Sequence, residues 1–411
     1  MIDGEYFFRR WWRAVCPRAL LFIALALGSG CKTAAYYGQA ARGQWQILAG
    51  REPIGKLLAD EKTPEKLQRQ LRLVLQLREF AERELKLPVD GHYERYVDVG
   101  RPFVVWNVQA TPEFSLRPRT WWYPIVGRVK YRGFFSEAAA RAYAATLAGQ
   151  DVYVEGVLAY STLGWFKDPV LNTFVNHEEL DLAQLLFHEL GHQRLFVSGD
   201  TDFNEAFATA VGEEGVRRWL QVAGRSADWE QYRVALVRQD QFVRLVQGAR
   251  AELRKLYGET STMAVAPRVA AAVSETHAVE LRTRKAEIIA HLRREYEALK
   301  ISWGGYRGYD RWFARPLNHA QLNTVATYHD LVPAFQELLQ ACGGDLAEFY
   351  AAAAKCGNLP RAERLSQLRK LAARETRGRP PNFLQLRIRP RLVARRRGAE
   401  IVLVKVRFRG R

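Results

Sequence analysis

The residues best suited to chemistry are two histidines four positions apart, with a glutamate directly after the first of them. His188 and His192 stand at positions i and i+4, so a helix would place both imidazoles on one face. Two imidazoles in this arrangement can bind one zinc ion together. Glu189 would then project beside the metal and could take a proton from an activated water. The pattern predicts a metal site with its own general base.

A third protein ligand is required, because a catalytic zinc keeps three protein ligands and one open position. Glu205 stands near the start of a second predicted helix, where it could face the first helix across the metal. It also has a structural alternative. Asp202 can cap that helix, and Glu205 would then reach back to the cap. An H-E-x-x-H helix followed by a third ligand is typical of zinc-dependent peptide hydrolysis.

The surrounding pattern predicts an α+β, mainly helical fold, with a small sheet beside the metal helix and a long helical hairpin. Residues 33–87 have helical spacing, and short β-rich runs broken by proline and glycine follow from Tyr93 to Tyr131. The expected later elements are a helix over 136–147, a strand over 151–162, helices over 178–196 and 204–222, and a hairpin made of 228–257 and 268–300.

Five parts are expected along the chain. They are a signal peptide (1–30), an N-terminal helical segment (31–90), a small β-rich subdomain with a substrate edge strand (91–170), a helical zinc-binding catalytic part (171–375) and a basic tail (376–411).

The first thirty residues have the order of a secretory signal, in which a basic stretch precedes an apolar run and small residues. Cys31 directly follows the small residues and resembles the acylated cysteine of bacterial lipoproteins. Lys32 comes next, and the resemblance then implies retention at the outer membrane, facing the periplasm. A plain secretory signal or an uncleaved short anchor are the alternatives. We predict that a lipid attached to Cys31 anchors the protein to the membrane.

The 411 residues carry a formal net charge of +18, which favours contact with polyanions. No nucleic-acid fold signature accompanies the charge, so no specific nucleic-acid partner is expected. The arginine-rich tail can meet anionic lipid or a surface polymer, or it can be a weakly structured extension. The sequence contains no C-x-x-C pair, so it does not support a zinc site built from thiolates. Cys342 and Cys356 can form a disulfide or remain two separate thiols.

Two segments, HELGHQ (His188–Gln193) and NEAFATAVGEE (Asn204–Glu214), resemble the zinc aminopeptidases of the gluzincin class. The resemblance implies His188, His192 and Glu205 as ligands of one zinc and Glu189 as base. The interval from His192 to Glu205 is shorter than in the alanyl-aminopeptidase kind. That spacing, together with the lipoprotein start, is similar to a bacterial group described as putative aminopeptidases. Three further stretches resemble the group: Tyr160–Leu171, Gly305–Phe313 and Thr327–Phe335.

The resemblance also implies a second donor for the oxyanion, a tyrosine or histidine from a later helix. Tyr328 is the first choice, Tyr306 and Tyr309 are alternatives, and His319 and His329 are further donors.

An aminopeptidase needs an anion for the substrate ammonium, and Glu155 is the predicted anchor. Tyr160 and Ser161 are predicted to bind the substrate along an edge strand, and Asn204 is predicted to orient a metal ligand.

The sequence therefore predicts a zinc aminopeptidase that acts on peptides in the cell envelope. Two alternatives remain open. An envelope endopeptidase would have no use for Glu155 as an anchor. A non-catalytic lipoprotein scaffold with a structural zinc would have no use for a base, so the presence of Glu189 favours catalysis.

Overall fold

The computed structural model describes residues 33–123, 127–159, 167–259 and 274–378. The chain divides into two units, Met1–Gly50 and Arg51–Arg411. Residues 33–49 of the first unit form a helix. Within the described ranges, every helix is too short or too polar to cross a membrane.

The continuous helix predicted over 33–87 is wrong, because the chain is interrupted twice. After residue 49 come β1 (Glu52–Pro53), α2 (Ile54–Ala59) and α3 (Glu65–Arg83). Pro53 and Pro64 each stand directly before a helix, with ψ of 130° and 133°. Proline cannot continue a helix because it lacks an N–H and clashes with the preceding turn, but it is tolerated at a helix start. A helical pattern that continues past a proline therefore belongs to separate helices on the two sides of it.

Three small sheets lie in the described residues, with the orders β1-β2-β8, β6-β3-β7 and β4-β5. The strands are β2 (Arg95–Val97), β3 (Val105–Pro112), β4 (Trp121–Tyr123), β5 (Gly127–Val129), β6 (Arg132–Phe134), β7 (Gln150–Val157) and β8 (Val170–Leu171).

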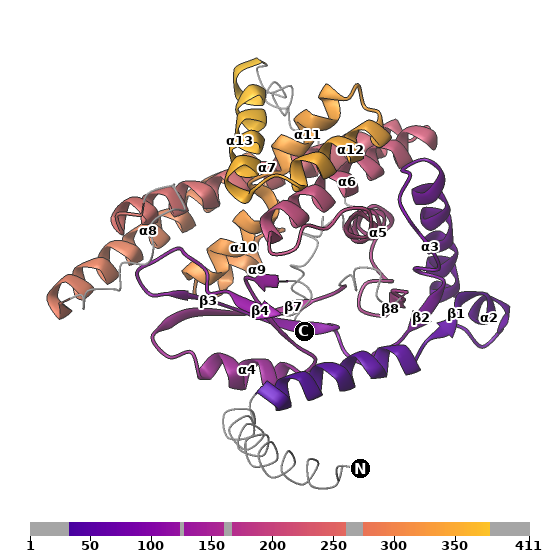
Figure 1. The fold of residues 1–411 in the computed structure, drawn as a ribbon, viewed down its shortest axis with the longest axis horizontal. Helices are drawn as coiled ribbons and strands as arrows, with labels where there is room; N and C mark the ends of the chain where they lie inside the picture. The colour runs from indigo at the N-terminus through magenta and orange to yellow at the C-terminus, as the bar shows by residue number, and fades with distance from the viewer. Residues whose placement is uncertain (1–32, 124–126, 160–166, 260–273, 379–411) are drawn as a thin grey trace, which may run out of the picture. The chain divides into compact units, whose positions relative to one another are not determined.

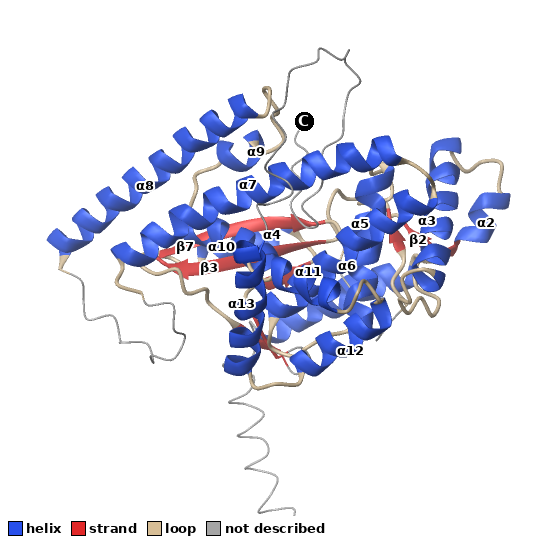
Figure 2. Ribbon diagram, turned by 90° about the horizontal axis from the view of Figure 1, so that it is seen from above, coloured by secondary structure: helices blue, strands red, loops and turns tan. Residues whose placement is uncertain are grey.

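The β6-β3-β7 sheet is covered on both faces. α4 (Glu137–Ala145) packs on one face and α10 (His319–His329) on the other, as the views in Figures 1 and 2 show. The central strand β3 is accordingly buried at nearly every position. At the edge of the sheet, β7 alternates between buried and half-buried side chains.

The other helices follow β8. They are α5 (Glu179–Arg194), α6 (Thr201–Val222), α7 (Ser226–Leu256), α8 (Glu275–Ser302), α9 (Asp310–Ala314), α11 (Val332–Ala341), α12 (Leu346–Gly357) and α13 (Arg361–Gly378). The predicted α+β, mainly helical class is confirmed.

α7 and α8 pack against each other around a buried aromatic cluster. Phe242 of α7 stacks on Tyr309 at a ring-centroid distance of 4.1 Å, and Tyr296 of α8 stacks on Phe313 at 4.0 Å. Aromatic rings therefore hold the two predicted long helices together.

Candidate metal centre

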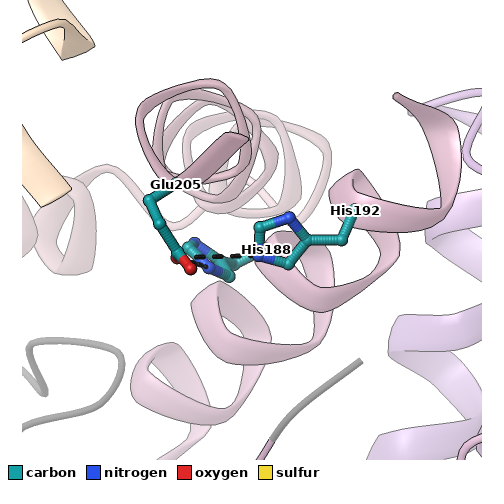
Figure 3. Close-up of side chains that lie close together, drawn as sticks. All are labelled: His188, His192 and Glu205. Carbon is teal, nitrogen blue, oxygen red and sulfur yellow. Dashed lines mark ion pairs between the residues drawn. The ribbon is translucent and has the colours of Figure 1, made fainter. Parts of the chain in front are cut away.

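Two buried helices bring the predicted ligands together. His188 and His192 extend from α5 and Glu205 from α6, and one ligand atom from each lies within 4.8 Å of the others. The Glu205 carboxylate is 3.3 Å from Nε2 of His188 and 3.6 Å from Nε2 of His192. Figure 3 shows both imidazoles and the carboxylate pointing toward one point. The side chains are at most 6% exposed.

The ligands can meet because α5 and α6 approach closely at glycine. A β-carbon on Gly212 would lie 2.9 Å from the Gln184 carbonyl oxygen and 3.4 Å from Cβ of His188. One on Gly191 would lie 3.3 Å from Cα of Ala208. Glycine within a helix costs up to about 1 kcal/mol relative to alanine, so its use here reflects the packing of the helices. Either glycine enlarged to alanine would push the ligand helices apart.

The short connection between the ligand helices is held by side chains on both sides of it. Asn204 accepts a hydrogen bond from the Val197 N–H at 2.7 Å and donates one to the Val197 carbonyl at 2.8 Å. Asp200 accepts the N–H of Phe203 and so caps α6. Arg364 of α13 binds the Asp200 carboxylate at 2.9 Å in a buried ion pair. These contacts place Glu205 one turn into α6.

The predicted cap at Asp202 is therefore wrong, since α6 begins two residues earlier than that prediction requires. The Asp202 carboxylate is bound instead by the Lys130 ammonium, at 2.7 Å, just beyond β5. Asp200 was available as the cap and carries the same side chain. Both aspartates face a cation, Arg364 at Asp200 and Lys130 at Asp202, so the local sequence does not choose between them as the cap.

The set of donors fits a metal ion of the zinc type. Two imidazoles and one carboxylate are the ligands of one common catalytic zinc arrangement, which leaves a fourth position open. Behind the ligands, the Thr209 hydroxyl lies 3.5 Å from Nδ1 of His188. With Nδ1 facing Thr209, Nε2 is directed at the carboxylate. The buried group of His188, His192 and Glu205 could therefore bind a metal ion.

Comparison with family models gives one decisive match. Residues 35–368 match the model described as "Putative aminopeptidase". The chain belongs to this family. Comparisons with curated proteins and with solved structures found no match. The family assignment supports a peptidase, and the match includes both ligand helices and the β6-β3-β7 sheet.

Glu189 of this family member is 1% exposed and follows the first histidine on α5. It stands four residues before Gln193, so the two side chains share the helix face next to that of the histidines. Gln193 donates a hydrogen bond to Asp168 at 3.2 Å. The face of α5 that carries Glu189 is thus in contact with the chain around residue 168.

Glu155 lies on the buried face of β7 and is 3% exposed. Gln109 of β3 donates a hydrogen bond to its carboxylate at 3.3 Å. Asp151 alternates in step with Glu155 along β7 and contacts His319 of α10. The carboxylate therefore belongs to the sheet face that α10 covers. It is a buried side chain of the edge strand in this sheet, not a surface carboxylate.

The structure does not describe the side chains of several predicted site residues. Cys31, Tyr160 and Ser161 lie outside the described residues. Tyr328 and His329 belong to the last turn of α10, but their side chains are not described.

The alternative donors have contacts of their own. Tyr309 and Tyr306 are half-buried and pack against the α7–α8 aromatic cluster. His319 is fully buried and its imidazole contacts the Tyr257 hydroxyl at 3.2 Å. Each of these side chains is thus used in packing.

Thr209 and the interface glycines were not predicted from the sequence. Glu205 and Thr209 are four residues apart on α6, as His188 and His192 are on α5. Two facing i, i+4 pairs, one with a hydroxyl, are the signal that could have identified Thr209.

Proposed function

We propose that this chain is an aminopeptidase that uses a single zinc ion held by His188, His192 and Glu205. The observation that carries the proposal is the buried group of two imidazoles and one carboxylate, with Glu189 on the same helix, in a member of the aminopeptidase family. The resemblance of both ligand segments to gluzincin aminopeptidases supports the same activity.

The chain's own residues would divide the reaction between them. When bound, zinc would supply Lewis-acid polarisation of the scissile carbonyl and of a water. The Glu189 carboxylate accepts the proton of the attacking water and passes it to the leaving amine. Its burial keeps bulk water from competing for that proton.

Glu155 is the proposed partner of the substrate ammonium. It is a buried carboxylate on an edge strand, and an edge strand can pair with an extended peptide. The ammonium would form a charge-assisted hydrogen bond with it, which is stronger than a neutral one.

Cleavage of matched peptides tests the activity. The full chain, purified in detergent and loaded with zinc, is given one peptide set with free amines and the same set N-acetylated. We expect cleavage of the free-amine set alone, and a loss of about 100-fold or more in Glu189→Gln at equal zinc content. Glu252→Gln, an exposed glutamate of α7, is the matched control. Cleavage of both sets would indicate an endopeptidase, and cleavage of neither would leave a zinc-binding scaffold.

We also propose that the protein is anchored by lipid at Cys31 in the outer membrane, facing the periplasm. The order of basic, apolar and small residues before Cys31 supports it. The basic tail would add contact with anionic lipid. Labelling with a radioactive fatty acid tests the anchor, and label retained in Cys31→Ser would refute it.

A further inference from the structure

The helix formed by residues 33–49, which we call the N-terminal helix, differs in composition from the rest of the chain. Charged residues make up 26% of the whole sequence, whereas Arg42 is the only charged residue in this helix. A helix at the surface of a globular protein usually carries charged or polar residues on the face opposite the core. The N-terminal helix therefore lacks the composition expected of a helix that faces water.

The face of the N-terminal helix that is open to solvent is apolar. Tyr37 is 45% exposed and Trp45 is 69% exposed. Ala34 and Ala41 are also exposed, and Leu48 is half-buried. Spacings of three and four residues place these five side chains on one face of the helix. We call this face the aromatic stripe.

The other side of the N-terminal helix is used for packing. Ile47 is 2% exposed, and Gly43, four residues before it, is buried as well. These two residues share the side of the helix that faces away from the aromatic stripe. Packing thus accounts for one side of the helix and leaves the aromatic rings of the other side open. Apolar patches that stay exposed in this way mark interaction surfaces.

The place of the N-terminal helix in the chain favours a lipid bilayer as the partner of the aromatic stripe. The helix begins two residues after Cys31, and the sequence of residues 19–27 is apolar and uncharged. Tyr37 is six residues from Cys31, so at most about 20 Å of extended chain separates them. A lipid attached to Cys31 would therefore hold the start of the aromatic stripe at the membrane surface.

The chemistry of the aromatic stripe suits the boundary between lipid and water. Tryptophan and tyrosine are enriched at that boundary, because each ring has an apolar body and a polar group. Arg42 is exposed and forms no ion pair with any residue in the described part of the chain, so it is available to an anionic headgroup. A second copy of the chain fits less well, since a stable protein interface takes about 20–30 residues on each side.

We propose that the aromatic stripe is a membrane-contact surface, with the N-terminal helix lying along an anionic bilayer and Tyr37 and Trp45 placed at its interface. Helices that bind in this way bury their apolar face about 5–10 Å into the boundary between headgroups and acyl chains. The inference goes beyond the proposed peptidase activity, and it extends the anchor proposed at Cys31. Contact at both Cys31 and the aromatic stripe would fix the orientation of the helix on the membrane.

Quenching of tryptophan fluorescence tests the contact. The full chain is reconstituted into vesicles of phosphatidylethanolamine and phosphatidylglycerol, with or without bromine on the acyl chains near the headgroups. Bromine quenches the tryptophans that reach it. Trp45→Phe keeps an apolar ring, so the protein should stay on the vesicles, but its quenching should fall below that of wild type. Trp122→Phe on β4 removes another exposed tryptophan and should leave the quenching unchanged, as the matched control.

The outcomes separate this inference from the proposals on anchor and activity. Quenching in Trp45→Phe equal to that of wild type, on vesicles that bind both proteins, overturns the inference and leaves the anchor at Cys31 intact. A dimer in detergent that becomes a monomer in Trp45→Asp also overturns it, because the aromatic stripe would then bind a second copy. Wild type that binds no vesicles removes both the inference and the anchor, whereas peptide cleavage is measured separately and is unaffected by any of these results.

Discussion

Among the described residues, the group of Asp151 and His319 and the metal centre each bring a histidine and a carboxylate together, and they differ in how the carboxylate charge is compensated. Asp151 on β7 is 2.7 Å from the Lys285 ammonium and accepts the N–H of His319 at 2.8 Å. Burial first, and then the charge of Lys285, lower the pKa of His319 to about 4, so its imidazole is neutral. In the metal centre, Glu205 faces two imidazoles instead.

The difference shows how to distinguish a structural polar cluster from a metal site. A buried carboxylate is stable only when something compensates its charge. At Asp151 the chain provides the compensation as a lysine. At Glu205 the nearby groups are themselves metal ligands, and a divalent cation at their centre would provide it. We expect the first group to respond to mutation through stability and the second through metal content.

Removal of a ligand should have the largest effect. His192→Ala leaves only two protein ligands, so it should abolish activity. Zinc affinity should fall by more than the about 10–100-fold that is lost when a hydrogen-bond partner of a ligand is removed. Zinc content is measured by mass spectrometry after dialysis against a competing chelator. His291→Ala, an exposed histidine on α8, is the control. One zinc retained in His192→Ala would refute the site.

Removal of the lysine should act on stability alone. Lys285→Met removes the ammonium beside the half-buried Asp151 carboxylate. The free energy of unfolding should fall by more than the about 1 kcal/mol of an exposed pair and by less than the about 3–5 kcal/mol of a fully buried one. Urea denaturation measures the free energy of unfolding, and zinc content should stay at the wild-type level. In the control Arg284→Met, the pair lost is exposed and the change should stay below about 1 kcal/mol. A loss of zinc in Lys285→Met would remove the distinction between the two groups.

A third buried carboxylate, Glu213 of α6, extends the comparison because its charge is compensated by a proton. Burial raises its pKa to about 7, while its hydrogen bonds from Gln336 and Gln239 lower it and the charge of Asp240 raises it. Burial first, and then the charge of Glu213, raise the pKa of the Tyr232 hydroxyl.

The folded state keeps the Glu213 proton that the unfolded chain releases near its ordinary value of 4.5. Its contribution to stability is therefore full below about pH 4.5 and falls as pH rises to about 7. At about 1.4 kcal/mol per pH unit, the loss is about 3 kcal/mol.

The variant Glu213→Gln should lack this decline, since its amide does not titrate. The free energy of unfolding, measured from pH 4.5 to 8 by urea denaturation, should therefore show a gentler slope in the variant than in wild type. Glu252→Gln, on the exposed face of α7, should follow wild type. Parallel curves for Glu213→Gln and wild type would mean that Glu213 is ionised in the fold.

The smallest expected effect belongs to Thr209. Thr209→Val removes the hydroxyl beside Nδ1 of His188 while keeping the side-chain shape. Partners behind a metal ligand contribute about 10–100-fold to metal affinity. Competition with a fluorescent chelator measures the change, and Thr283→Val on the exposed face of α8 is the control. Unchanged affinity would show that helix packing alone orients His188.

The sequence pattern predicted the bounds of the two ligand helices to within a few residues. The helix predicted over 178–196 is found at Glu179–Arg194, and the end predicted at residue 222 is found there. Strong periodicity over a long segment makes such elements readable. The cap at Asp202 and the helix across Pro53 failed because alternative local patterns were nearly equal in quality. The hairpin strand β4 and the strand β6 were recognised as β-rich but not separated correctly, because short strands carry little signal.

Some features of this protein were determined by its sequence alone. The spacing of His188, Glu189 and His192 is a local property of one helix, so the two imidazoles and the base follow from residue order. Whether Glu205 reaches the two imidazoles depends on the glycines that let α6 approach α5. These contacts join residues far apart in the chain, and only packing of the whole unit decides which of them meet.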